Sequence, residues 1–148
     1  MTPRDLHFDK EGREKLLKGI TLMSKTVKST LGPLGNTVLI ESNNHTKGLT
    51  ITKDGVTVAK DVELEDPVEN LAVKMMKEAA DRTATSAGDG TTTAIVLTEA
   101  IVREGMRLID SEPNINTSQL ARDINFLSRS VIKSLDKSSK KVSGRTLR

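Results

Sequence analysis

Three short stretches of the chain combine residue types that suit the binding of phosphate groups. The most informative one reads Ala87-Gly88-Asp89-Gly90-Thr91-Thr92-Thr93-Ala94, in which two glycines bracket an acid ahead of three threonines. Three β-branched residues are a poor helix start on propensity alone, so another demand must favour them here. A helix N-terminus offers unpaired N–H groups to an anion, glycines let the backbone come close, and Asp89 offers an oxygen ligand for Mg²⁺. An ordinary helix cap after a glycine stop explains this stretch equally well when it is taken alone.

The second stretch, Thr30-Leu31-Gly32-Pro33-Leu34-Gly35, follows a predicted helix. Its glycines would free backbone N–H groups to turn toward a phosphate, although an ordinary C-terminal turn is the commoner explanation. The third stretch, Thr52-Lys53-Asp54-Gly55, follows a predicted strand, and Asp-Gly is a common hairpin turn. The functional interpretation gives the charge of Lys53 to a phosphate and places Asp54 near the terminal phosphate or its attacking water.

The combination of the three stretches is more specific than any one of them. Together they supply positioning and charge stabilisation, which are the main requirements of phosphoryl transfer. No G-x-x-x-x-G-K-[ST] sequence occurs, so the predicted site is not a standard P-loop.

The elements that must position these stretches are mainly helical. The clearest start signal places Asp66 at a helix cap, Pro67 at the first helical position and Glu69 at the third, and Gly88 would end that helix. Another helix is expected to be capped by Asp9. The predicted elements are a short extended start at 5–8, helices over 9–30, 67–87, 91–112 and 117–135, and two paired strands at 37–41 and 49–52. The predicted fold is therefore mainly α, a helical bundle with a small β-hairpin.

The composition limits the kinds of core and site that the chain can form. Of its 148 residues 35% are hydrophobic, with two Phe and neither Trp nor Tyr, so the core must be built from aliphatic residues and Met. This fraction is low for an independent domain, which suggests that apolar faces await a partner or more chain. Without Cys, disulfides, thiolate metal sites and cysteine nucleophiles are excluded.

The charge pattern argues against nucleic-acid and membrane partners. The net charge is +3, and its excess gathers near the end of the chain at Lys133, Lys137, Lys140, Lys141, Arg145 and Arg148. No aromatic residues accompany these cations to stack on bases, so a solvated helix face and a loose tail are favoured over a nucleic-acid patch. The N-terminus is charged, and no apolar run approaches the roughly 20 residues that cross a bilayer. A soluble, cytoplasmic protein is expected.

Four segments, TLGPLGN, ITKDGVTVAK, ELEDPVEN and AGDGTTTA, resemble those of group I chaperonins, the GroEL type. They occur in that family's order and close to its spacing, and the similarity extends over nearly the whole chain. The resemblance implies that 1–135 is the N-terminal part of an incomplete equatorial ATPase domain. It also implies that 136–148 is the start of the connection to an intermediate domain, or a loose basic tail.

The resemblance further implies an ATP and Mg²⁺ site in a chaperone that couples ATP hydrolysis to protein folding. Asp89 would be the metal ligand, and Asp54 would assist catalysis near the terminal phosphate. The nucleotide contacts would be Thr30, Leu31, Gly32, Pro33, Lys53, Gly88, Asp89, Gly90, Thr91, Thr92 and Thr93. The implied partners of the complete family are ATP, unfolded protein clients, a co-chaperonin and other chaperonin subunits.

The sequence departs from the family pattern in three places. Leu34 stands where members commonly have a lysine, and the segment 42–48 is longer and more polar than the usual hairpin turn, which puts the usual ring contacts in question. The chain also stops near the first crossing into the intermediate domain. It therefore lacks the later acid that serves as general base, and weak or absent hydrolysis is expected of it alone.

Two other functions compete with an ATP-binding chaperonin segment. The first is a truncated interaction subunit that modulates the assembly of a full-length chaperonin, since the helices carry apolar stripes without a completing half. The second, ranked last, is a basic helical protein that binds nucleic acid through its Lys-rich end, with an affinity that falls steeply as salt rises.

Overall fold

A computed structural model of the chain describes residues 9–41 and 48–140. The chain divides into two compact units, Met1–Met106 and Arg107–Arg148, with the boundary inside a helix. The extended start expected at 5–8 lies outside the described residues. The division into 1–135 and 136–148 stays a prediction.

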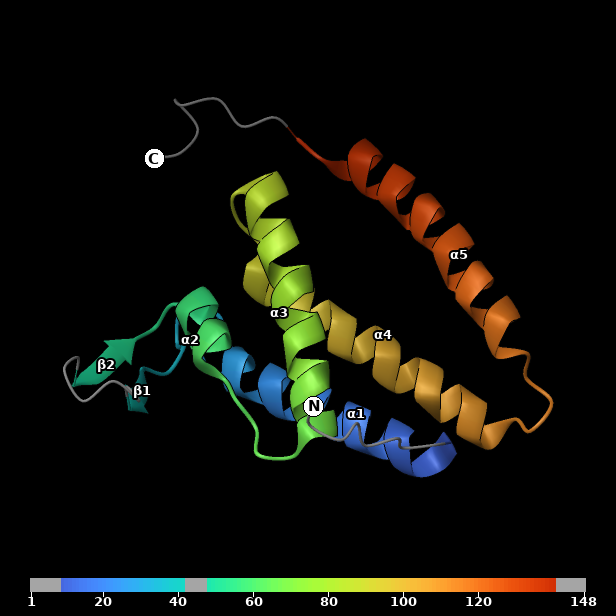
Figure 1. The fold of residues 1–148 in the computed structure, drawn as a ribbon. Helices are drawn as coiled ribbons and strands as arrows, with labels where there is room; N and C mark the ends of the chain where they lie inside the picture. The colour runs from blue at the N-terminus through green and yellow to red at the C-terminus, as the bar shows by residue number, and fades with distance from the viewer. Residues whose placement is uncertain (1–8, 42–47, 141–148) are drawn as a thin grey trace. The chain divides into compact units, whose positions relative to one another are not determined.

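The described residues form helices and one small sheet (Figure 1). The elements are α1 Asp9–Lys28, β1 Val38–Glu41, β2 Leu49–Thr52, α2 Gly55–Asp61, α3 Pro67–Ala87, α4 Thr91–Ser111 and α5 Thr117–Ser138. The two strands pair antiparallel, with Val38 opposite Thr52 and Glu41 opposite Leu49. The predicted class, mainly α with a small hairpin sheet, is confirmed.

The limits of α3 follow from its sequence. Asp66 caps the helix, because its Oδ1 accepts hydrogen bonds from the backbone N–H groups of Val68 (2.8 Å) and Glu69 (3.1 Å). Gly88 ends it in the left-handed conformation at φ 73°. The carboxylate of Glu69 takes a different role from the expected capping box, since it accepts a hydrogen bond from the ammonium of Lys18 on α1.

The core of the first unit lies where the helices α1 to α4 meet. In Figure 1, α1 crosses α3 at a steep angle, and its contacts extend to α2. The buried side chains are aliphatic or Met, as the composition requires: Met23, Val27, Val58, Ala59, Val73, Met76, Ala80 and Ile95. The first unit thereby fixes the end of α1 relative to the starts of α2 and α4.

One helix and several element boundaries differ from the sequence-based expectation. The helix α2 was not predicted, and the interpretation of Asp54 and Gly55 as a hairpin turn is wrong, because Asp54 caps this helix. The helix α1 begins at Asp9 itself, so Asp9 does not precede it as a cap, and α1 ends at Lys28. The helix α5 continues to Ser138, three residues beyond Leu135.

The second unit contains the end of α4, a short connection and α5. Asn116 caps α5, since its Oδ1 accepts a hydrogen bond of 3.0 Å from the backbone N–H of Gln119. No side chain of α5 is buried. Among the described residues, no helix is both long and apolar enough to cross a membrane.

Candidate functional site

The three predicted phosphate-binding stretches meet at Gly55, the first residue of α2. A Cβ placed on this buried glycine would overlap with Oγ1 of Thr92 and lie 3.0 Å from Oγ1 of Thr30. All three residues belong to the first unit. The end of α1, the start of α2 and the start of α4 therefore form one site, and only a residue without a side chain fits at its centre.

The loop after α1 is folded back on itself. The backbone N–H of Asn36 donates to the carbonyl of Ser29 at 2.7 Å, and that of Gly35 donates to the carbonyl of Gly32 at 3.0 Å. Gly32 has a φ of 84°, a conformation that favours glycine. The hydroxyl of Thr30 donates a 2.8 Å hydrogen bond to the carbonyl of Val27, in the last turn of α1. These bonds hold the loop in a defined shape while Leu31, Gly32 and Pro33 stay exposed.

The turn between α3 and α4 is built on two left-handed glycines. Gly88 and Gly90 have φ values of 73° and 85°, and an added Cβ would meet no described atom within 4 Å at either position. The backbone beside them is therefore open to a ligand. Thr91 is buried, Thr92 half-buried and Thr93 exposed at the first turn of α4, where backbone N–H groups have no partner within the helix. The turn has the form of an anion site at a helix N-terminus.

Asp89 fits the single protein ligand of a magnesium ion. It is exposed, and its Oδ1 accepts a 2.6 Å hydrogen bond from the backbone N–H of Gly90. Its other oxygen has no hydrogen-bond or ion-pair partner among the described residues. No group of three His, Cys, Asp or Glu side chains suited to a metal occurs in the described part of the chain. Mg²⁺ at nucleotide sites is commonly held by one or two carboxylates with phosphate oxygens and water, so one aspartate suffices.

Asp54 caps the start of α2 with both of its carboxylate oxygens. Its Oδ1 accepts from the backbone N–H of Val56 at 3.2 Å, and its Oδ2 accepts from the N–H and the hydroxyl of Thr57 at 3.1 and 2.7 Å. The hydroxyl of Thr57 contributes most to lowering the pKa of Asp54, and the two backbone N–H groups and Lys60 lower it further. A carboxylate with a lowered pKa is a weak proton acceptor at neutral pH. Asp54 is therefore unsuited to take a proton from a water molecule at neutral pH.

Lys53 lies between β2 and this cap and is exposed. Its ammonium has no hydrogen bond or ion pair with another described residue. It is thus available to a phosphate, which a compact cation can contact without the bidentate geometry of arginine.

The structure brings two of the predicted site residues together in space, and it relates several others to them only through their positions along the chain. Thr30 and Thr92 meet at Gly55, while Lys53 and Asp54 precede Gly55 in the chain and Asp89 precedes Thr92 by three residues. Gly55 itself was missed. The signal that could have found it is the spacing of Asp54 and Thr57, which is typical of a capped helix start and puts Gly55 at the first helical position.

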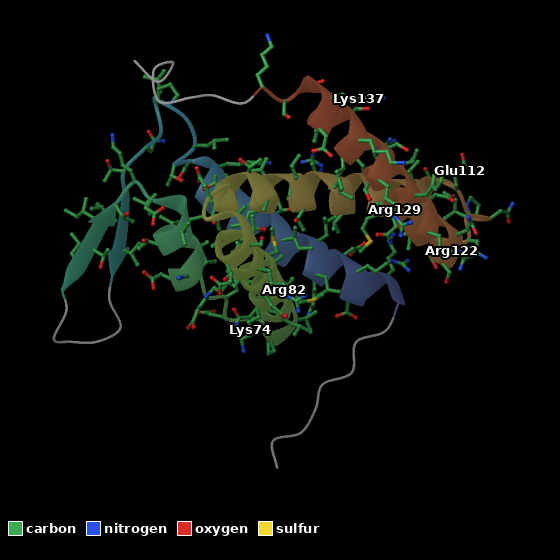
Figure 2. The ribbon with its side chains drawn as sticks, turned by 90° about the horizontal axis from the view of Figure 1, so that it is seen from above. Lys74, Arg82, Glu112, Arg122, Arg129 and Lys137 are labelled. Carbon is green, nitrogen blue, oxygen red and sulfur yellow. The ribbon has the colours of Figure 1, made fainter. Side chains whose placement is uncertain are left out.

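A second surface feature of the first unit is an open hollow along α3. Two of the residues that line it, Lys74 and Arg82, are labelled in Figure 2. It is lined by charged and hydroxyl side chains, namely Lys74, Lys77, Glu78, Asp81, Arg82, Thr85 and Ser86. All of them belong to one helix, so the hollow is a charged helix face and does not enclose a ligand.

Comparison with known proteins identifies the family to which a chain with this fold belongs. The model of the TCP-1/cpn60 chaperonin family matches residues 23–147, and the chain belongs to this family. A solved structure of the chaperonin gp146 from the bacteriophage EL 2 (Pseudomonas aeruginosa), in the presence of ATP-BeFx, is similar to 90% of the chain at 31% identity with a TM-score of 0.74. In a second crystal form of gp146, also with ATP-BeFx, the values are 30% and 0.71.

The chain spans 22% and 23% of the length of these two solved chains. Membership of the chaperonin family supports a chaperone-type function. The matching family model does not separate group I from other chaperonins, so the assignment to group I stays a prediction.

Proposed function

We propose that the chain is the ATP-binding portion of a chaperonin that couples ATP hydrolysis to protein folding. The observation that carries the proposal is the meeting of Thr30 and Thr92 at Gly55, which places a glycine-containing loop beside the N-terminus of α4. The first turn of α4 presents backbone N–H groups that have no partner within the helix, and such groups stabilise phosphate charge. The presence of ATP-BeFx in the gp146 structures gives independent support.

In this proposal each predicted site residue has a distinct task. The loop of Thr30 to Pro33 and the turn of Gly88 to Thr93 hold the phosphates, and Lys53 adds a positive charge. Asp89 holds Mg²⁺, which neutralises phosphate charge when it is bound. Asp54, already ionised and hydrogen-bonded, orients the attacking water.

We propose that the chain alone hydrolyses ATP weakly or not at all. The lowered pKa of Asp54 makes this carboxylate a poor general base. The family resemblance assigns the base to an acid later in a complete chain. Unfolded clients, a co-chaperonin and other subunits are proposed as partners of the complete protein, and a cytoplasmic location stays a prediction.

Titration of the chain with ATP and Mg²⁺ by calorimetry tests the proposal. We expect binding that requires Mg²⁺, and Asp89→Ala should weaken it at least about tenfold, because it removes the proposed metal ligand. Asp110→Ala is the matched control, since Asp110 is an exposed acid at the opposite end of α4.

Equal effects of the two substitutions, or no binding by the unaltered chain, would contradict the ATP site. Turnover comparable to that of an intact chaperonin, abolished by Asp89→Ala, would contradict the proposal of weak hydrolysis.

A second candidate function is an interaction subunit that associates with a full-length chaperonin and alters its assembly. The observation that favours it is the exposure of large apolar side chains on two helices of the first unit, Leu71 and Met75 on α3 and Leu97 and Ile101 on α4. Exposed apolar surface of this kind is typical of interaction sites. Co-migration of the chain with an intact chaperonin on a sizing column is the expected result.

A further inference from the structure

Glu99 is a buried carboxylate held by two cations. It lies on α4 with 1% of its surface exposed. Its Oε2 accepts a 2.8 Å hydrogen bond from Nζ of Lys28 on α1, and its Oε1 accepts a 2.8 Å hydrogen bond from Nη1 of Arg103 one turn further along α4. We name these three residues the Glu99 triad. All belong to the first unit.

Burial of a charge at this place is not explained by stability. Ile95, one turn earlier on the same helix, is part of the hydrophobic core, so Glu99 continues a buried helix face. Replacement of a buried ion pair by apolar residues of similar size is often neutral or stabilising, since desolvation offsets the attraction. What the carboxylate adds is geometry, because two directed hydrogen bonds fix it and its partners.

The Glu99 triad connects the two halves of the candidate site. Lys28 is the last residue of α1, and Thr30 follows it by two residues. Glu99 lies about two turns after Thr91, the first residue of α4. The ion pair between Lys28 and Glu99 therefore connects the end of α1, which precedes the loop of residues 30–35, to α4, whose N-terminus is the second proposed phosphate segment. Lys28 also lies at the negative end of the α1 dipole, where a cation is stabilised.

We propose that Glu99 is a positioning residue of the nucleotide site: through Lys28 it holds the loop of residues 30–35 against the start of α4 and so raises the affinity for Mg-ATP. This inference rests on the proposed ATP-binding function. Glu99 does not touch the ligand in this proposal and acts only through the placement of the two segments.

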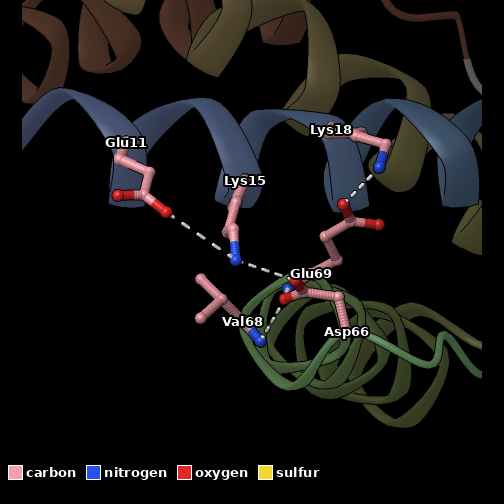
Figure 3. A network of polar contacts seen from close by, with 6 residues as sticks. All are labelled: Glu11, Lys15, Lys18, Asp66, Val68 and Glu69. Carbon is pink, nitrogen blue, oxygen red and sulfur yellow. Dashed lines mark hydrogen bonds and ion pairs between the residues drawn. The ribbon is translucent and has the colours of Figure 1, made fainter. Parts of the chain in front are cut away.

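The chain offers a matched control in Glu69. This residue is also a buried carboxylate, with 7% of its surface exposed, and it pairs with the ammonium of Lys18 on α1 (Figure 3). The pair of Glu69 and Lys18 thus joins α1 to another helix just as the pair of Glu99 and Lys28 does. It lies nearly three turns earlier on α1, away from the loop.

Hydrogen exchange of the nucleotide-free chain measures the positioning directly. In Glu99→Gln, we expect the hydrogen-bonded amides of the two segments, those of Thr30, Leu31, Gly35, Asn36 and Ala94, to exchange roughly tenfold faster. In Glu69→Gln, these amides should exchange as in the unaltered chain, and any acceleration should appear near the start of α3. Equal acceleration of the loop by both substitutions, or by neither, would overturn the proposal.

A Mg-ATP titration of the same variants measures the consequence for binding. We expect Glu99→Gln to weaken binding about 3- to 30-fold and Glu69→Gln to leave it unchanged. Unchanged affinity in Glu99→Gln would overturn the proposal. No binding by the unaltered chain would refute the ATP site itself, and the exchange of the nucleotide-free chain would still decide whether Glu99 holds the loop.

Lys28 provides a second set of variants that disturbs the core less, because its side chain is 40% exposed. Lys28→Gln should accelerate exchange of the loop and weaken Mg-ATP binding in the same way as Glu99→Gln. Lys28→Arg keeps the charge and should restore both values. If Lys28→Arg accelerated loop exchange and weakened Mg-ATP binding as much as Lys28→Gln does, the ion pair would not position the loop.

Discussion

Gly55 carries no side chain, and this allows two threonine hydroxyls from distant parts of the chain to approach the start of α2. The hydroxyls of Thr30 and Thr92 occupy the space where any other residue would place its Cβ. Glycine is required at position 55 by its close neighbours and not by its backbone conformation, because the φ of Gly55 is not in the left-handed range. The glycine therefore acts as a spacer that sets how closely the predicted phosphate segments meet.

Gly55→Ala should destabilise the first unit and disturb the site together. The added methyl group overlaps with Thr92 and presses on Thr30, and overpacking of this kind costs about 1–3 kcal/mol. Urea unfolding followed by circular dichroism measures the change in the free energy of unfolding. Mg-ATP binding should weaken in the same variant.

Gly105→Ala is the control for this substitution. Gly105 lies within α4, and an added Cβ would meet no described atom within 4 Å. Alanine in a helix interior is favoured over glycine by about 0.5–1 kcal/mol, so this variant should be more stable. If both alanines had effects of the same sign, the crowding at Gly55 would not be the cause.

At the scale of single elements, the contact between α1 and α3 includes a titrating pair. Nζ of Lys15 lies 2.9 Å from Oδ2 of Asp66, the cap of α3. The hydrogen bond from Lys15 is the main cause that lowers the pKa of Asp66 from 3.8 to about 2, and the backbone N–H groups of Glu69 and Val68 also contribute. The ionised carboxylate thus stabilises the folded chain above pH 3.8, and this contribution is lost as the pH falls toward about 2.

Asp66→Asn should therefore destabilise the chain near neutral pH and much less in acid. Asparagine is also a good N-cap, so the substitution removes the charge and keeps the cap. The difference in unfolding free energy between the two proteins should shrink as the pH falls from 3.8 toward about 2. Urea unfolding at a series of pH values measures it, with Asp123→Asn on α5 as the control. A difference that did not depend on pH would contradict the ion pair.

Most elements could be predicted because their ends carry local signals. Asp66, Pro67 and Gly88 mark α3 within the sequence itself, and the strands follow from β-branched runs. The helix α2 could not be predicted from periodicity, since its seven residues make only about two turns. Its Asp54 and Gly55 also match a hairpin turn, which local sequence alone does not distinguish from a cap.

The residue types of the candidate site could be selected from the sequence, but the way in which the structure brings them together could not. Glycines, hydroxyls and acids identified the stretches, because phosphate chemistry requires such groups. The meeting of Thr30, Gly55 and Thr92 depends on how α1, α2 and α4 pack. The partner of Glu99 had no signal at all, since Lys28 is far from it in sequence and lies in an ordinary basic last turn.

At the scale of the whole molecule, the chain has few apolar residues and a small core, and many of its large apolar side chains are exposed. The apolar residues of α3 fall into two groups: Ala72, Met76 and Ala80 are buried, whereas Leu71 and Met75 are 53% and 63% exposed. Exposed apolar side chains of this kind are typical of interaction sites. The chain covers 22% of the length of the gp146 chain that it resembles.

The exposed apolar residues of α3 predict which substitutions separate folding from association. Leu71→Gln with Met75→Gln should abolish co-migration with an intact chaperonin, because apolar groups that would leave water on binding are replaced by polar ones. Each substitution should change the unfolding free energy by only about 0.5 kcal/mol, since both side chains are largely exposed. Lys74→Gln with Glu78→Gln, which replaces charged neighbours of Leu71 and Met75 on the same exposed side of the helix, should leave co-migration unchanged. If the charged pair abolished association and the apolar pair did not, the partner would recognise charge on α3, and the apolar side chains would have no part in binding.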